Sequence, residues 1–228
     1  MDIVLGKTAG FCYGVNNAVT KAEEFVKNNK EKNIYCLGEL VHNKQVVQKL
    51  EKEGLKFIEK LEEISKKDKL TVIIRAHGEP KSTYEFLKNN KIEILDLTCP
   101  NVLAIHKLVE EKVKDGFYIF LIGQKTHPET IGTKGFCDDN CSVIETKEDI
   151  ELTFNKFFEH NKNKIFVVVQ TTFSLEKFNN LCEIIKDRIN DEILKNPQAQ
   201  GITLEIRNTI CNATRFRQEE TEKLSKDV

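Results

Sequence analysis

The feature that most constrains the fold is a repeated alternation of short apolar runs with longer amphipathic segments. Three runs are almost wholly apolar: LTVIIR at Leu70–Arg75, FYIFLI at Phe117–Ile122 and IFVVV at Ile165–Val169. Runs of this length, bounded by polar residues or glycine, predict strands that are buried on both faces. Because helical segments separate them, the strands should be parallel and covered by helices. The predicted fold class is therefore α/β, built from repeated parallel-sheet lobes.

Three less regular stretches complete this prediction. The short apolar segment Asp2–Leu5 is expected to open the chain as a strand. Residues 123–135 form a stretch bounded by glycines, which predicts a loop. Lys147–Thr153 is expected to be a short helix.

The predicted strand ends carry side chains that bind metals, hold phosphate or move protons. In parallel sheets the carboxyl ends of the strands form one edge, and ligands bind outside that edge. A single polar residue there would carry little weight, but a repeated series predicts a functional site. The series is Cys12, His42, His77, Cys99, His127 with Glu129, Thr171 with Thr172, and Cys211.

Cys12, Cys99 and Cys211 share one context, because each lies shortly before a predicted helix. The clearest case is the strand Ile92–Leu97, which ends just before Cys99 and is followed by the helix Asn101–Lys114. The unpaired N–H groups of a helix start favour the thiolate, the form of cysteine that binds metal or attacks. Three thiolates suit an iron–sulfur cluster or zinc, with one metal position left open for substrate. A zinc hydrolase is the less favoured alternative, because the sequence has no H-E-x-x-H.

The other four cysteines are expected to have no role in such a site. Cys36 and Cys182 lie in predicted strand and helix interiors, where free cysteine is usually a small buried hydrophobe. Cys137 and Cys141 form a C-x-x-x-C without further ligands at zinc-finger spacing, which favours coincidence. Seven cysteines are an odd number, so a disulfide framework is not expected.

Imidazole and carboxyl groups supply the remaining chemistry. His42, His77 and His127 each lie beside a glycine or a helix start, a setting that suits a phosphate or diphosphate group. Glu129 follows His127 by two residues and could protonate a leaving alcohol. His106 lies within a helix of alternating charge and is expected to be solvated.

Charge and hydropathy exclude several classes of partner. The 35 basic and 36 acidic residues nearly cancel, which disfavours binding to nucleic acid or to an anionic membrane. No apolar run is long enough to span a bilayer, and the first residues lack a signal-peptide pattern, so a cytoplasmic location is expected. A Rossmann dehydrogenase is disfavoured because no G-x-G-x-x-G follows the first predicted strand.

Seven short motifs in order along the whole chain resemble those of the 4-hydroxy-3-methylbut-2-enyl diphosphate reductases, the LytB family. They are Gly10–Val15, Val41–Asn43, Ala76–Gly78, Asp96–Pro100, His127–Glu129, Gln170–Thr172 and Ile210–Thr214.

The resemblance implies an oxidoreductase for the last step of the non-mevalonate pathway of isoprenoid biosynthesis. It would remove the substrate hydroxyl reductively to give isopentenyl and dimethylallyl diphosphates, with electrons from a donor such as ferredoxin or flavodoxin. By motif, Cys12, Cys99 and Cys211 resemble the ligands of a [4Fe-4S] cluster. The three site histidines resemble the contacts to the allylic diphosphate substrate. Glu129 resembles the proton donor, and Thr171 or Thr172 the hydroxyl near the substrate alcohol.

The resemblance also implies a domain organisation. The family fold is a trefoil of three α/β lobes, and family members continue past the point that corresponds to Val228. We therefore expect a first lobe at 1–98, a second at 99–207 and the start of a truncated third at 208–228. Two alternatives follow: a weakly active or inactive fragment, and a non-catalytic iron–sulfur or phosphate-binding module.

Overall fold

The computed structural model describes residues 3–64, 70–195 and 201–226 of the chain. The chain divides into two compact units. The first unit is Phe11–Leu103, and the second is Ala104–Val228 together with Met1–Gly10. Residues 208–228 belong to the second of these units. The division of the chain into two lobes and the start of a third stays a prediction.

The first unit alternates helices and strands as the sequence predicts. Its elements are α1 (Tyr13–Asn28), β1 (Asn33–Leu37), α2 (Lys44–Lys52), β2 (Lys56–Ile58), the 3₁₀ turn η1 (Leu61–Glu63), β3 (Leu70–Ile74), α3 (Lys81–Asn89) and β4 (Glu93–Asp96). All four strands are parallel, in the order β2-β1-β3-β4. The order reverses between β1 and β3, which makes their carboxyl ends the switch point where ligands bind in such sheets.

The second unit repeats this plan. Its elements are α4 (Pro100–Lys114, which starts in the first unit), β5 (Tyr118–Ile122), α5 (Pro128–Lys134), β6 (Cys141–Ile144), α6 (Asp149–Glu159), β7 (Lys164–Val169), α7 (Leu175–Lys195), β8 (Thr203–Ile206) and α8 (Asn212–Lys226). Its strands are parallel in the order β6-β5-β7-β8, so the switch point lies between β5 and β7. By position, β5, β7 and β8 correspond to β1, β3 and β4 of the first unit.

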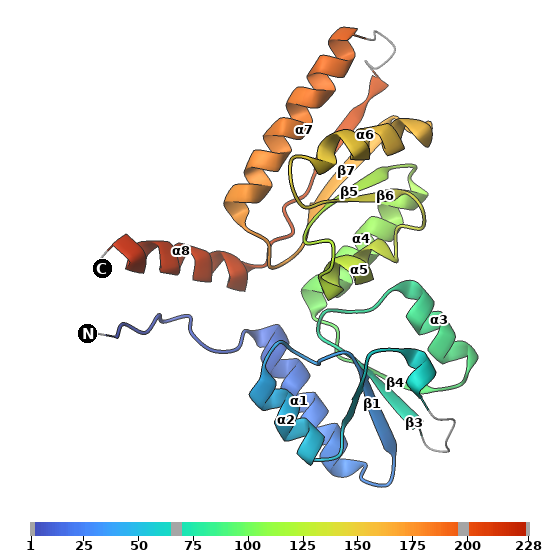
Figure 1. The fold of residues 1–228 in the computed structure, drawn as a ribbon, viewed down its shortest axis with the longest axis vertical. Helices are drawn as coiled ribbons and strands as arrows, with labels where there is room; N and C mark the ends of the chain where they lie inside the picture. Colours follow the sequence, from blue (N-terminus) through green and yellow to red (C-terminus); the bar gives the residue numbers. More distant parts are fainter. Residues whose placement is uncertain (1–2, 65–69, 196–200, 227–228) are drawn as a thin grey trace. The chain divides into compact units, whose positions relative to one another are not determined.

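Helices cover both faces of each sheet, as the apolar strands require (Figure 1). In the first unit, α1 and α2 pack on one face around Cys36, and α3 packs on the other through Leu87. In the second unit, α6 and α7 cover one face and α4 the opposite one. Phe154 and Phe157 of α6 are fully buried against that sheet, and each such side chain stabilises the fold by about 1.5–3 kcal/mol.

The structure corrects three of the predicted elements. The described residues 3–5 form no strand, and the side chains of Ile3 and Leu5 are 89% and 81% exposed. The predicted loop at 123–135 contains the helix α5, which Pro128 opens at a position that proline favours. The short helix predicted at Lys147–Thr153 is instead α6, which starts later and continues to Glu159 because its phenylalanines bury against the sheet.

Within the described residues, no helix combines the length and the apolar character that crossing a membrane requires.

Candidate active site

The three candidate cysteine ligands lie at helix starts, as the sequence predicts. Cys12 is the residue that precedes α1, Cys99 precedes α4 and Cys211 precedes α8. All three are neither fully buried nor fully exposed, and none of them forms a disulfide. Because they are partly exposed, a metal can reach them, and each lies beside the positive end of a helix dipole.

In the first unit, Cys99 lies against the helix that Cys12 opens. A Cβ atom placed on Gly14 would be only 2.7 Å from the Cys99 sulfur, so that sulfur touches the first turn of α1. The backbone N–H of Cys99 donates to the Ala76 carbonyl oxygen at 2.9 Å, which ties the end of β4 to the turn after β3. Two predicted ligands, Cys12 and Cys99, thus belong to neighbouring turns of one unit.

The close approach at Gly14 makes a testable prediction. Alanine normally stabilises a helix relative to glycine by up to about 1 kcal/mol. At position 14 the added methyl group would overlap the Cys99 sulfur, and overpacking of this kind costs about 1–3 kcal/mol. We therefore expect Gly14→Ala to lower the thermal unfolding midpoint and to reduce the iron bound after anaerobic reconstitution. Gly201→Ala is the matched control, since a Cβ there meets nothing within 4 Å. A Gly14→Ala chain that is more stable and binds full iron would contradict the contact.

His42 and His77 lie together at the switch point of the first unit. Their rings lie against each other, with centroids 4.4 Å apart and planes tilted by 38°. His42 is exposed, with its Nδ1 atom 3.8 Å from a carboxylate oxygen of Glu39. His77 follows β3 and His42 follows β1, so the structure confirms that strand order brings these two imidazoles to one edge.

Sequence reasoning missed a buried ion pair beneath this edge. Nε of Arg75 lies 2.7 Å from Oε1 of Glu79, and Glu79 is only 5% exposed. The guanidinium also lies against Gly38, where φ is +68° and where a Cβ would overlap it. Arg75 therefore joins the turn that leads to His42 to the turn that contains His77. The signal in the sequence was a charged residue directly after a buried apolar strand.

The switch point of the second unit holds a buried carboxyl group. Glu129 is 3% exposed, and both of its oxygens accept hydrogen bonds from Thr171. The Thr171 backbone N–H donates to Oε1 at 2.6 Å, and its hydroxyl donates to Oε2 at 2.7 Å. Burial raises the pKa of Glu129 above its usual value, although the two bonds from Thr171 act in the opposite direction. A raised pKa keeps the proton on this carboxyl closer to neutral pH, which suits a proton donor.

The two threonines that the sequence could not distinguish have different surroundings. Thr171 is buried and contacts Glu129, whereas Thr172 is exposed and its hydroxyl accepts a hydrogen bond from Nε2 of Gln170 at 2.7 Å. Oε1 of Gln170 in turn accepts from the backbone N–H of Gln124 at 3.0 Å. Gln170 and Thr172 therefore stabilise the turn, and Thr171 is the residue in contact with the carboxyl group.

Thr171 also links this carboxyl group to the third candidate ligand. Its carbonyl oxygen accepts from the backbone N–H of Cys211 at 3.0 Å. The Cys211 sulfur accepts from the backbone N–H of Thr214 at 3.4 Å and lies 3.1 Å from the Thr214 hydroxyl. The Cys211 sulfur therefore faces the backbone N–H groups at the start of α8. The same carbonyl-to-cysteine bond joins Ala76 and Cys99 in the first unit, so the two units repeat the arrangement.

His127 precedes α5, and the bond it makes sets its tautomer. Its Nδ1 atom accepts from the backbone N–H of Glu129 at 3.1 Å. A neutral ring with an accepting Nδ1 carries its hydrogen on Nε2, which is the arrangement that donates to an anionic oxygen.

The structure decides the remaining predictions about single residues. The prediction that His106 is solvated is wrong. His106 is 2% exposed and stacks on Phe136 with ring centroids 4.3 Å apart. Its helix α4 turns this face toward the sheet, which the alternating charges of the sequence obscured. Cys36 and Cys182 are buried among apolar side chains, as predicted.

Comparison with known proteins decides the family. The family model described as LytB protein matches residues 3–228. The chain belongs to the LytB family. Membership of this family implies an iron–sulfur cofactor, to which the three half-buried thiols at helix starts correspond chemically.

Curated LytB relatives cover the chain from end to end. A 4-hydroxy-3-methylbut-2-enyl diphosphate reductase of Caldanaerobacter subterraneus subsp. tengcongensis is 40% identical over 230 residues, covering 100% of this chain and 73% of the relative. The reductase of Clostridioides difficile is 38% identical over 228 residues and is covered to 75%. The chain thus spans about three quarters of the length of these relatives.

Solved structures of LytB proteins have the same fold. The reductase from Plasmodium falciparum superposes with a TM-score of 0.80 at 33% identity, over 96% of this chain and 63% of that one. A second reductase structure, described as the terminal enzyme of the non-mevalonate pathway, gives a TM-score of 0.73 at 36% identity. It covers 99% of this chain and 74% of the other.

Proposed function

We propose that this chain carries the catalytic residues of a 4-hydroxy-3-methylbut-2-enyl diphosphate reductase. The observation that supports this most directly is the pair of bonds from Thr171 to Glu129, together with the bond that ties the same threonine to Cys211. They connect a buried, protonatable carboxyl group to a candidate metal ligand through one residue. Removal of a hydroxyl as water needs a proton delivered where a metal holds the alcohol, and this arrangement suits that task.

Cys12, Cys99 and Cys211 would hold a [4Fe-4S] cluster through their thiolates. The support is chemical: each is partly exposed, forms no disulfide and lies at a helix start, and the Cys211 sulfur already accepts a backbone hydrogen bond. When bound, the cluster would supply the electrons and a Lewis-acidic iron for the substrate hydroxyl.

The histidines would bind the diphosphate end of the substrate. His42 and His77 share one edge of the first unit, and His127 has the tautomer that donates from Nε2. Donors to phosphate oxygens are charge-assisted and contribute about 1.5–3 kcal/mol each. Glu129 would give its proton to the departing oxygen, and the Thr171 hydroxyl would hold the carboxyl in place and lie near the same alcohol.

Partners follow from this chemistry. The small-molecule partner would be the allylic diphosphate, and electrons would come from a one-electron donor of the ferredoxin or flavodoxin type. Nothing in the charge balance of 35 basic and 36 acidic residues favours nucleic acid.

A reconstitution experiment tests the proposal. The chain is reconstituted anaerobically with iron and sulfide, freed of unbound metal, and mixed with the allylic diphosphate and a chemical reductant. We expect iron and acid-labile sulfide in equal amounts, close to four of each per chain for a [4Fe-4S] cluster. We also expect formation of isopentenyl and dimethylallyl diphosphates. Bound zinc without sulfide would revive the hydrolase alternative, and a full cluster without either product would favour the non-catalytic module.

A further inference from the structure

The segment that leads to Cys211 runs beside the end of β7 and continues its parallel pairing with β8. The backbone N–H of Arg207 donates to the Val167 carbonyl oxygen at 2.8 Å. The backbone N–H of Cys211 donates to the Thr171 carbonyl oxygen at 3.0 Å. Midway between these two bonds lies Val169, which is fully buried. Its backbone N–H and C=O groups therefore need hydrogen-bond partners.

The hydroxyl group of Thr209 supplies these partners. Its oxygen accepts from the Val169 backbone N–H at 3.0 Å, and its hydrogen is donated to the Val169 carbonyl oxygen. A hydroxyl group can do this because it both donates and accepts. One side chain therefore joins the two strands between the bond at Val167 and the bond that holds Cys211.

The first unit has the corresponding position without a side chain in this role. There the backbone N–H of Leu97 donates to the carbonyl oxygen of Ile74, the last residue of β3, at 3.0 Å. Leu97 lies two residues before Cys99, as Thr209 lies two residues before Cys211. The backbone alone thus leads β4 to Cys99, whereas a hydroxyl group bonds to the end of β7 before Cys211.

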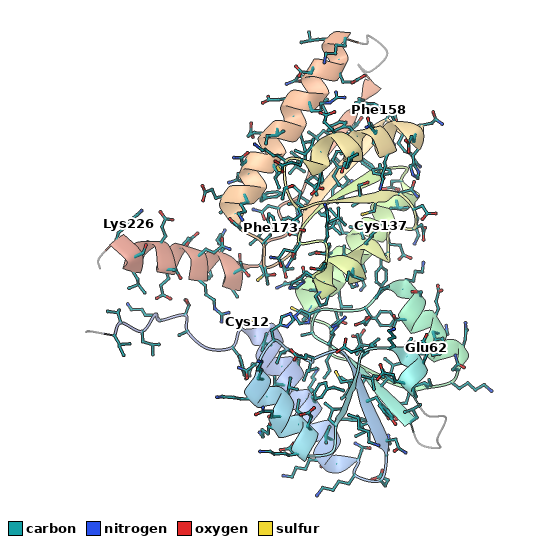
Figure 2. The ribbon with its side chains drawn as sticks, in the orientation of Figure 1. Cys12, Glu62, Cys137, Phe158, Phe173 and Lys226 are labelled. Carbon is teal, nitrogen blue, oxygen red and sulfur yellow. The ribbon has the colours of Figure 1, made fainter. Side chains whose placement is uncertain are left out.

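The neighbours of Thr209 are held independently of its hydroxyl group. Ile210 packs against the apolar cluster of the second unit, which includes Phe173 just after the turn at 170–172 (Figure 2). Oδ1 of Asn208 accepts from the Ile210 backbone N–H at 3.0 Å. Loss of the hydroxyl group should therefore loosen the pairing locally, while the segment stays attached to the core.

We propose that Thr209 is a positioning residue that holds Cys211 in register with Thr171. It acts through the Val169 backbone, which leads to Thr171 two residues later. Thr171 in turn bonds Glu129, so the register sets where the candidate ligand lies relative to the buried carboxyl group. The catalytic consequence rests on the proposed reductase function, whereas the register itself does not.

Amide hydrogen exchange tests the register without any cluster. It is measured by NMR on the full chain before reconstitution, for the parent, Thr209→Val and Thr209→Ser. Valine keeps the shape of the side chain without the hydroxyl group, and serine keeps the hydroxyl group. We expect the Cys211 amide to exchange about 10–100-fold faster in Thr209→Val, because the pairing is broken at Val169. The Arg207 amide, which lies before the break, should keep its rate, and Thr209→Ser should match the parent.

Thr153→Val is the matched control, because Thr153 is a buried threonine of α6 in the same unit. It should leave the ratio of the Cys211 rate to the Arg207 rate unchanged. An unchanged Cys211 rate in Thr209→Val would overturn the proposal, and so would equal acceleration at Arg207. Equal effects of valine and serine would overturn it as well, since the hydroxyl group would then have no special role. A Thr209→Val chain that does not fold would show that the hydroxyl group is needed for the fold and not for the register, which also rejects the proposal.

Kinetics of the reconstituted protein separate positioning from substrate binding. Thr209→Val should lower kcat per bound cluster about 10–100-fold, because a small displacement of reacting groups has an effect of this size. The KM for the allylic diphosphate should stay unchanged, since the histidines proposed to bind it make no contact through Val169. Thr209→Ser should restore kcat. A raised KM with full kcat would contradict the positioning role. A parent chain with a full cluster but no turnover would reject the proposed function, and the exchange rates would still decide the role of Thr209.

Discussion

Replacing Glu129 with glutamine should lower the kcat of the reductase by about 10²–10⁴-fold, the range expected for loss of a general acid. Glutamine keeps the size of the side chain, and its carbonyl oxygen can still accept from the Thr171 backbone N–H. The Thr171 hydroxyl can rotate and accept from the new amide group, since a hydroxyl both donates and accepts. The change therefore removes the transferable proton while both contacts to Thr171 are kept.

The measurement is kcat under saturating substrate, with iron content and thermal unfolding as checks on the protein. Glu159→Gln is the matched control, because Glu159 is an exposed glutamate of the same unit and should retain full turnover. Full turnover by Glu129→Gln with an intact cluster would exclude Glu129 as the proton donor. Equal loss in both variants would point to a general effect of the substitution on the chain.

The pH dependence of kcat tests the same residue independently. Burial raises the pKa of Glu129, so its proton is retained to higher pH than in an exposed glutamate. A proton donor works below its pKa, so kcat should fall as the pH rises through that value. Thr171→Val removes a hydrogen bond that lowers this pKa, which should move the falling limb to higher pH. Thr172→Val leaves the carboxyl contacts in place and should leave the limb where it is.

Replacing Cys99 with serine should remove most of the bound cluster and with it all measurable reductase turnover. Cys99 is a half-buried cysteine that forms no disulfide and lies against the first turn of α1, and serine is a poor ligand for iron in an iron–sulfur cluster. The fold should persist, because the Cys99 backbone bonds to Ala76 and to the first turn of α4 do not involve the sulfur. The measurements are iron, acid-labile sulfide and visible absorption after anaerobic reconstitution.

Cys182→Ser is the control for this experiment. Cys182 is a buried thiol of α7 in the apolar core, so serine there should reduce stability by about 1–3 kcal/mol without lowering the iron content. Equal iron in Cys99→Ser and in the parent chain would reject Cys99 as a ligand. Equal iron loss in both variants would show that instability, and not ligation, controls the reconstitution.

The local sequence pattern was sufficient to predict the strands of the sheets and the positions of the candidate cysteines at helix starts. The strands β3, β5 and β7 were predicted within one residue at each end, because their runs are almost wholly apolar and each is bounded by polar residues or glycine. The helix starts at Cys12, Cys99 and Cys211 followed from the strand ends before them or from the helical pattern after them. The parallel arrangement followed as well, since a helical connection between strands leaves few other topologies.

The helix α5 shows where local pattern failed. Gly132 and the β-branched residues around it have weak helix propensity, so the stretch resembles a loop. Its buried polar side chains find hydrogen-bond partners only in the packed unit, where Glu129 accepts two bonds from Thr171 and the Thr130 hydroxyl donates to Oε1 of Gln170 at 3.3 Å. The burial of His106 against Phe136 is of the same kind, because it depends on a residue that is far away in the sequence.

The sequence by itself therefore determined an α/β chain with thiols and imidazoles at the strand ends, and its motifs placed those residues in the LytB family. Only the tertiary structure decided that Glu129 is buried, that Thr171 and not Thr172 contacts it, and that His106 stacks on Phe136. The physical reason is the range of the interactions. Strands and helix starts are determined by neighbours a few residues away, whereas the bond between Glu129 and Thr171 joins groups that lie 42 residues apart and meet only when β5 and β7 pair.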